Sequence, residues 1–147
     1  MFTPLAPCHR EDYLRMAEAF YHSDAVDHAV PPSHFSAAFD ALVAGSPYLS
    51  GFALTQDGQI AGYALLMKTW SQEAGGLTVW VDELYVEPLF RGHGLGREFL
   101  QALPRLFPEA VAFRLELAPD NHRAESLYGR LGFRPLAYRQ MIRQIDP

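Results

Sequence analysis

The sequence predicts one α/β domain over residues 1–147, in which helices flank both faces of a mixed sheet. Two observations support this. Segments with apolar residues at helical spacing are interspersed with strand-like apolar runs, in the order β-α-α-β-β-β-α-β-α-β. Hydrophobic residues make up 49% of the chain and charged residues 20%, which is typical of a globular domain with a single core.

The period of the apolar residues places these elements along the chain. Strands are expected where apolar residues alternate or run together, and helices where they recur every three or four residues. The expected strands are residues 2–5, 51–55, 60–67, 77–86, 111–117 and one or two strands within residues 133–145. The expected helices are residues 11–21, 33–44, 94–107 and 121–131, with a loop over residues 23–32.

A few residues mark where these elements begin or end. Asp57-Gly58 lies between two apolar runs and is a strong signal for a hairpin turn. Ser33 and Asn121 are expected to cap the second and fourth helices, and Gly45 to end the second. Pro104 lies late in the third helix, and because proline lacks a backbone N–H, we expect it to weaken that helix or end it early.

Charge and cysteine content exclude several classes of protein. The formal net charge is −5, whereas a nucleic-acid-binding protein usually carries a basic face. With one cysteine, Cys8, neither an internal disulfide nor a cysteine-built zinc site is possible. No apolar run reaches the roughly 18 residues that span a bilayer, and no signal peptide is evident. We therefore expect a soluble cytoplasmic protein with no nucleic-acid or membrane partner.

Histidines give no metal site either. His22, His28 and His34 recur every six residues, whereas two ligands on one helical face need a spacing of about four. We expect no metal, although a histidine of this segment is suitably placed to line a substrate site.

The glycine-rich stretch around residues 91–96 is the most informative part of the sequence. It follows a strand and a proline-containing turn and opens a helix, so free backbone N–H groups and the helix dipole are available to an anion. Glycines let the backbone approach a pyrophosphate, and the guanidinium of Arg91 suits phosphate. The spacing of glycines fits neither the dinucleotide fingerprint nor the P-loop.

Two motifs resemble those of a known superfamily. Leu84-Tyr85-Val86-Glu87-Pro88 and Arg91-Gly92-His93-Gly94-Leu95-Gly96 resemble the acetyl-CoA-binding motif of the GNAT acyltransferases, Arg/Gln-x-x-Gly-x-Gly/Ala. A second block, with Asn121, Tyr128 and Gly132-Phe133 as landmarks, resembles the next strand and helix of that superfamily. The two blocks cover residues 79–135, and the N-terminal half agrees in the order of its elements. The resemblance implies a mainly antiparallel central sheet of six or seven strands flanked by four helices.

The resemblance also implies an activity and a cofactor site. It implies an N-acetyltransferase in which the amine attacks acetyl-CoA directly, without a metal, and it allows a homodimer. Backbone amides of the glycine-rich loop would hold the CoA pyrophosphate, and the preceding strand end would pair with the pantetheine arm. The implied cofactor-binding residues are Leu84, Tyr85, Val86, Arg91, Gly92, His93, Gly94, Leu95, Gly96 and Asn121.

Acyl transfer to an amine needs a base and benefits from an acid. An alkylammonium has a pKa near 10.4, so a carboxylate must remove its proton, and a tyrosine hydroxyl is suited to protonate the departing thiolate. The resemblance implies Tyr128 as the acid. Asp82, Glu83 and Glu116 are the candidate bases, and we favour the first two jointly. Adjacent strand residues face opposite sides, so Asp82 and Glu83 share a cleft only if the strand contains a bulge.

The acceptor is expected to be the primary amine of a small cationic molecule. Val-Asp-Glu-Leu-Tyr-Val, residues 81–86, resembles the matching strand of spermidine/spermine acetyltransferases, and an acidic cleft attracts a cation. Two alternatives remain open. One is a protein N-terminal or lysine acetyltransferase, in which Glu116 would take the place of the base. The other is a CoA-binding paralogue without catalysis.

Overall fold

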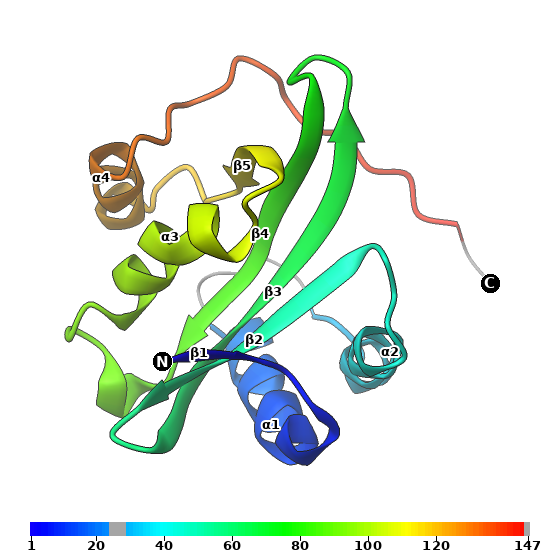
Figure 1. Ribbon diagram of the computed structural model, residues 1–147, viewed down its shortest axis with the longest axis vertical. Helices are drawn as coiled ribbons and strands as arrows, with labels where there is room; N and C mark the ends of the chain where they lie inside the picture. Colours follow the sequence, from blue (N-terminus) through cyan, green and yellow to red (C-terminus); the bar gives the residue numbers. More distant parts are fainter. Residues whose placement is uncertain (24–28, 146–147) are drawn as a thin grey trace.

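A five-stranded sheet between two pairs of helices forms the molecule, in a computed structural model that describes residues 1–23 and 29–145 (Figure 1). The strand order is β1-β2-β3-β4-β5; only β4 and β5 run parallel. The mixed α/β class with four α-helices is confirmed, whereas the described sheet has five strands instead of six or seven. The elements are β1 (Phe2–Pro4), η1 (Pro7–His9), α1 (Arg10–Tyr21), α2 (Pro32–Val43), β2 (Leu49–Gln56), β3 (Gln59–Ser71), β4 (Gly76–Val86), η2 (Pro88–Phe90), α3 (Leu95–Leu106), β5 (Ala110–Leu115) and α4 (His122–Arg130).

Two cores lie on opposite faces of the sheet. Helices α3 and α4 cover one face, where Leu54, Leu66 and Phe99 are fully buried. Helices α1 and α2 cover the other, where aromatic side chains such as Tyr13 and Tyr63 predominate. Strand β4, which Figure 1 shows between the two helix pairs, contributes side chains to both cores: Val79 and Val81 to the first and Tyr85 to the second.

Several sequence signals act as predicted. Asp57 and Gly58 both adopt positive φ, 51° and 77°, which are the angles that a two-residue hairpin between β2 and β3 needs. Asn121 caps α4, because its side-chain oxygen accepts a hydrogen bond from the N–H of Ala124 at 3.1 Å. Gly45 follows the end of α2 with a φ of 82°, which a glycine adopts without strain.

One of two predictions about helix ends is wrong. Helix α2 begins at Pro32 with Pro31 as its N-cap, and Ser33 makes no cap hydrogen bond. Proline is favoured in the first turn, because its φ is already helical and its missing N–H has no partner there. Helix α3, by contrast, matches the expected range of 94–107 to within one residue at each end. It continues past Pro104 to Leu106, since one lost hydrogen bond near its end is offset by the buried apolar face of the helix.

The C-terminal segment differs most from the prediction. Residues 133–145 contain no strand, and we attribute this in part to Pro135, which cannot donate to a ladder. Side chains attach the segment instead. The hydroxyl of Tyr138 donates to Glu73 at 3.4 Å, and the amide of Gln140 donates to Glu116 at 2.5 Å. The segment therefore crosses from α4 to the far end of the β3–β4 hairpin, as Figure 1 shows in orange and red.

The described residues contain neither a membrane helix nor a cluster of metal ligands. Within residues 1–23 and 29–145, every helix is too short or too polar to cross a bilayer. The same ranges hold no group of three His, Cys, Asp or Glu side chains placed to bind a metal ion. His28 and part of the expected loop over residues 23–32 lie outside the described residues.

Candidate active site

Strands β4 and β5 separate halfway along β4. Strand β4 pairs with β3 from Gly76 to Val86, but its pairing with β5 extends only from Leu77 to Val81. The β5 side of the last five residues of β4 therefore faces no strand in the described part of the chain. An extended ligand is able to add to such an edge through its own amide groups.

A β-bulge lies where this separation begins. Leu65 of β3 is opposite Glu83, whereas the next residue, Leu66, is opposite Val81, so Asp82 is the extra residue. Val81 and Leu84 consequently face the same core, and Glu83 turns to the opposite face. The sequence indicated that Asp82 and Glu83 could lie near one cleft only if the strand contained a bulge, and β4 contains one.

Glu83 is buried and held by two tyrosines. Its side chain is 5% exposed, and its two carboxylate oxygens accept hydrogen bonds from the hydroxyls of Tyr21 and Tyr63, each at 2.5 Å. Burial raises the pKa of Glu83, the two hydrogen bonds oppose that shift, and the charge of Asp82 adds to it. Through these bonds Glu83 links α1 and β3 to β4, and because it is buried it is poorly placed to meet a substrate directly.

Asp82 is the exposed carboxyl group of the pair. Partial burial of the carboxyl by surrounding atoms, and then the charge of Glu116, raise its pKa above the ordinary range of aspartate. Glu116 directly follows β5 and is exposed, and Gln140 of the C-terminal segment donates to it. The structure thus brings two carboxyl groups near each other across the opening between β4 and β5, and only Asp82 has no hydrogen-bond donor among the described residues.

The glycine-rich loop leads from β4 into α3. Gly92 and Gly94 have φ of 83° and 86°, and Gly94 is the N-cap of α3. A side chain at either position would meet no atom within 4 Å, so backbone conformation, and not crowding, requires glycine. A Cβ on Gly96 would approach Leu84 at only 3.7 Å, an ordinary contact. The first N–H groups of α3 have no backbone acceptor among the described residues and are free to bind an anion.

Arg91 is fastened to the end of β4. Its Nε donates to the backbone oxygen of Val86 at 2.8 Å, and its guanidinium lies 5.5 Å from the centre of the Tyr85 ring. This contact uses one of the donors that the sequence assigned to phosphate and leaves the others available. The charge is therefore held at a defined place beside the loop.

Tyr128 lies in α4, with its ring against that of Phe133 at 5.9 Å and an edge-to-face geometry. It is half-buried beside the core under α3, and this burial raises the pKa of its hydroxyl. The hydroxyl has no hydrogen-bond partner in the described part of the chain. Asn121, the other landmark of this block, is exposed, and its oxygen is used by the helix cap.

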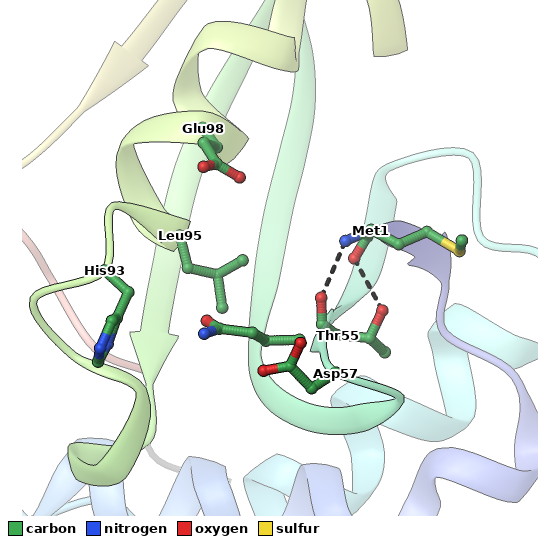
Figure 2. A pocket seen from close by; sticks show the side chains of 7 residues that line it. Met1, Thr55, Asp57, His93, Leu95 and Glu98 are labelled. Carbon is green, nitrogen blue, oxygen red and sulfur yellow. Dashed lines mark hydrogen bonds between the residues drawn. The ribbon is translucent and has the colours of Figure 1, made fainter.

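A cavity lies on the hairpin side of the loop. Figure 2 shows the β2–β3 turn on one side of it and the start of α3 on the other. Its lining residues are Met1, Thr55, Gln56, Asp57, His93, Leu95 and Glu98. Of the predicted residues, His93 and Leu95 therefore line this cavity, whereas Asp82 and Glu116 lie at the opening between β4 and β5.

Sequence reasoning missed the partners of Glu83. Tyr21 ends α1 and Tyr63 lies on β3, 62 and 20 residues from Glu83. The contact of Tyr63 with Glu83 follows from the register of β3 against β4, and that of Tyr21 from the packing of α1 against the sheet. The cross-strand contact between Trp80 and Arg114 was missed for the same reason.

Comparison with known proteins agrees with this geometry. A model of the acetyltransferase (GNAT) family matches residues 11–133. The spermine/spermidine N(1)-acetyltransferase of Bacillus subtilis (strain 168) is 28% identical over 91 residues, 58% of this chain and 60% of that protein. The putative ribosomal protein bS18-alanine N-acetyltransferase of the same strain is 28% identical over 97 residues, 61% of this chain and 57% of that protein. The matches thus span about three fifths of each relative.

A solved structure shares the fold. The structure of AAC(6')-Iy, in complex with a bisubstrate analogue that contains CoA, superposes with a TM-score of 0.80. The alignment covers 99% of this chain and 98% of that chain at 16% identity, which shows the fold alone. Since the family model spans residues 11–133 and the strand, loop and helix landmarks occupy the expected elements, this chain belongs to the acetyltransferase (GNAT) family.

Proposed function

We propose that the chain transfers the acetyl group of acetyl-CoA to the primary amine of a small cationic acceptor, by direct attack of the amine. The observation that carries this proposal is the position of Asp82. It is an exposed carboxyl group with a raised pKa, on the bulge where β4 and β5 part. A base at that point lies next to the open edge of β4, where we propose that the acceptor amine meets acetyl-CoA.

The residues around β4 fit CoA. The free N–H groups at the start of α3, with Arg91 beside them, suit a pyrophosphate, and the open edge of residues 84–86 suits the amide groups of a pantetheine arm. Acetyl-CoA, when bound, supplies the acetyl group as a thioester. The presence of CoA in the ligand of the structural relative supports this assignment.

Asp82 acts as the base in this proposal. It accepts a proton from the acceptor ammonium, directly or through a water, and leaves the neutral amine to attack. The raised pKa brings Asp82 closer to the working pH, which makes it a better proton acceptor than an ordinary aspartate. Glu83 is buried and bound by two tyrosine hydroxyls, so it supports the wall of the site instead of sharing the proton.

Tyr128 acts as the acid. Its hydroxyl has no protein partner among the described residues, and its burial keeps it protonated at neutral pH. A proton donated from this hydroxyl to the departing sulfur neutralises the thiolate. Tyr128 would therefore act in the transition state and contribute little to the binding of acetyl-CoA.

Charge favours a cationic acceptor. Asp82 and Glu116 are exposed at the opening, the formal net charge is −5, and one relative is named for spermine and spermidine. The ribosomal-protein relative makes a protein N-terminus the alternative acceptor, with Glu116 as the base. The two hypotheses differ in their base. If Asp82 is the base, a substitution at Glu116 leaves a working base in place.

A panel of acceptors tests the proposal. Polyamines, amino acids with side-chain amines and short peptides are incubated with acetyl-CoA, and release of free thiol is followed. We expect turnover with small cationic amines that Asp82→Asn greatly reduces. Turnover with peptides alone, abolished by Glu116→Gln, would support the protein acetyltransferase, and CoA binding without turnover of any acceptor would support a non-catalytic paralogue.

A further inference from the structure

Trp80 and Arg114 form a pair across β4 and β5. They are opposite each other in the strand register, and the guanidinium carbon of Arg114 lies 4.3 Å from the centre of the Trp80 ring. Register also identifies the face. On β3, residues 63, 65 and 67 share one face of the sheet, and they are opposite Tyr85, Glu83 and Trp80. The pair therefore lies on the α1/α2 face of the sheet, the same face as Glu83.

Arg114 has no carboxylate partner in the described part of the chain. This distinguishes it from Arg10, which pairs with Asp40, and from Arg15, which pairs with Glu87. A tryptophan ring holds a guanidinium in place without neutralising its charge or using its N–H groups. Arg114 is therefore a fixed cation whose fork of donors is still available to a carboxylate.

The position of Arg114 relates it to the proposed acceptor site and not to the CoA phosphates. Asp82 follows Trp80 by two residues along β4, and Glu116 follows Arg114 by two residues, so the pair and the carboxyl groups are about 7 Å apart along the strands. Val86, which precedes the glycine-rich loop, is six residues from Trp80, or about 20 Å. An anion at Arg114 is thus a different group from a pyrophosphate at α3.

We propose that Arg114, held on the ring of Trp80, binds a carboxylate of the acceptor while the reacting amine lies at Asp82. This inference rests on the proposed function and narrows its substrate class to amino acids that carry a second amine on the side chain. Asp82 lies two positions along the strands from the Trp80–Arg114 pair. This spacing suits an acceptor whose reacting amine is several bonds away from its carboxylate, and not an α-amine. A polyamine lacks the group that Arg114 would bind.

Matched acceptors test this inference. Lysine and ornithine are compared with lysinamide, in which the carboxylate is neutral, and with cadaverine, in which it is missing. We expect kcat/KM for lysine to exceed that for lysinamide by about tenfold or more, as one charge-assisted bidentate contact provides. In Arg114→Met this ratio falls to about one, and Arg114→Lys, which keeps the charge without the fork, retains part of it.

A matched arginine serves as the control, and different results would overturn this inference and the proposed function. Arg105 is exposed in the last turn of α3 and has no ion pair among the described residues, so Arg105→Met should keep the lysine-to-lysinamide ratio of the unaltered protein. A ratio near one in the unaltered protein, or a ratio that Arg114→Met does not change in a variant with a normal thermal melt, overturns the inference while leaving the proposed function intact. Absence of turnover with every amine tested overturns the proposed function itself.

Discussion

The middle of β4 and the loop at its end are built in different ways. The loop from Arg91 to Gly96 depends on backbone angles and free N–H groups of neighbouring residues. The site at Asp82 and Glu83 depends on a strand bulge and on side chains brought from α1 and β3. We infer that substitutions in the loop act on cofactor affinity, whereas substitutions in the middle of β4 act on proton transfer or on stability. Each prediction below tests this division.

The largest effect is expected from Asp82→Asn. Loss of a general base lowers kcat by roughly 100- to 10,000-fold at neutral pH. In the unaltered protein activity should rise with pH as Asp82, whose pKa is raised, loses its proton. In the variant this rise disappears, and the remaining activity increases at higher pH, where free amine is more abundant. Steady-state kinetics over a pH series measures both effects.

The control for that experiment is Asp40→Asn. Asp40 is an exposed aspartate of α2 that pairs with Arg10, away from the opening between β4 and β5. Its substitution should leave both kcat and the pH profile as they were. If Asp82→Asn also leaves the pH profile unchanged, the base is another group, and Glu116→Gln becomes the variant to examine.

Tyr128→Phe is expected to lower kcat by about 100-fold with little change in the KM for acetyl-CoA, because the hydroxyl would act in the transition state. The ring is retained and the hydroxyl has no described partner, so the thermal melt should be nearly unchanged. Tyr48→Phe, at a 71% exposed tyrosine, is the matched control. A lower melting temperature with normal kcat would show that Tyr128 is only a core residue.

Gly94→Val should weaken CoA binding by about tenfold or more, measured by calorimetry. Valine is strained at a φ of 86°, so the N–H groups beside it are displaced, and one charge-assisted hydrogen bond contributes about 1.5 kcal/mol. Gly45→Val imposes the same strain at a φ of 82° after α2, far from the loop. It should lower stability similarly and leave CoA affinity intact. Equal affinities in the two variants would contradict the role of the loop.

Among these variants, Glu83→Gln should have the smallest effect on catalysis. Its main effect should be a lower stability of the fold. One tyrosine hydroxyl loses its acceptor, which costs about 1–3 kcal/mol of unfolding free energy. The pKa of Glu83 is raised in the folded state, so the folded protein holds this proton more tightly than the unfolded chain. The contribution of Glu83 to stability is therefore greatest at low pH and falls as pH rises above its ordinary value of about 4.3.

Denaturant unfolding of the Glu83→Gln variant across pH measures this. Its stability should vary less with pH than that of the unaltered protein, since the variant has no proton to lose at this position. Glu109→Gln, at an exposed glutamate before β5, serves as the control. A loss of kcat as large as in Asp82→Asn, without a change in stability, would make Glu83 the base.

The order of elements from the first strand to the fourth helix was predictable, because apolar period, turn residues and caps act over a few positions. The hairpin at Asp57-Gly58 and the cap at Asn121 are examples. The start of α2 was not, because the competing local signals of Pro31-Pro32 and Ser33 are decided by packing. The strands expected within residues 133–145 are not present. A strand forms only where a neighbouring strand offers unpaired backbone N–H and C=O groups in register, and the local sequence does not show this.

By itself, the sequence determined the strand–loop–helix unit and the residues that resemble a CoA site, because glycine conformations and helix ends are local properties of the chain. The tertiary structure alone decided which carboxyl group is exposed. A bulge sends Glu83 to two tyrosines and leaves Asp82 at the opening, and register places Arg114 on Trp80. These contacts join residues 20 to 62 positions apart, and only the alignment of whole strands and helices brings such residues together.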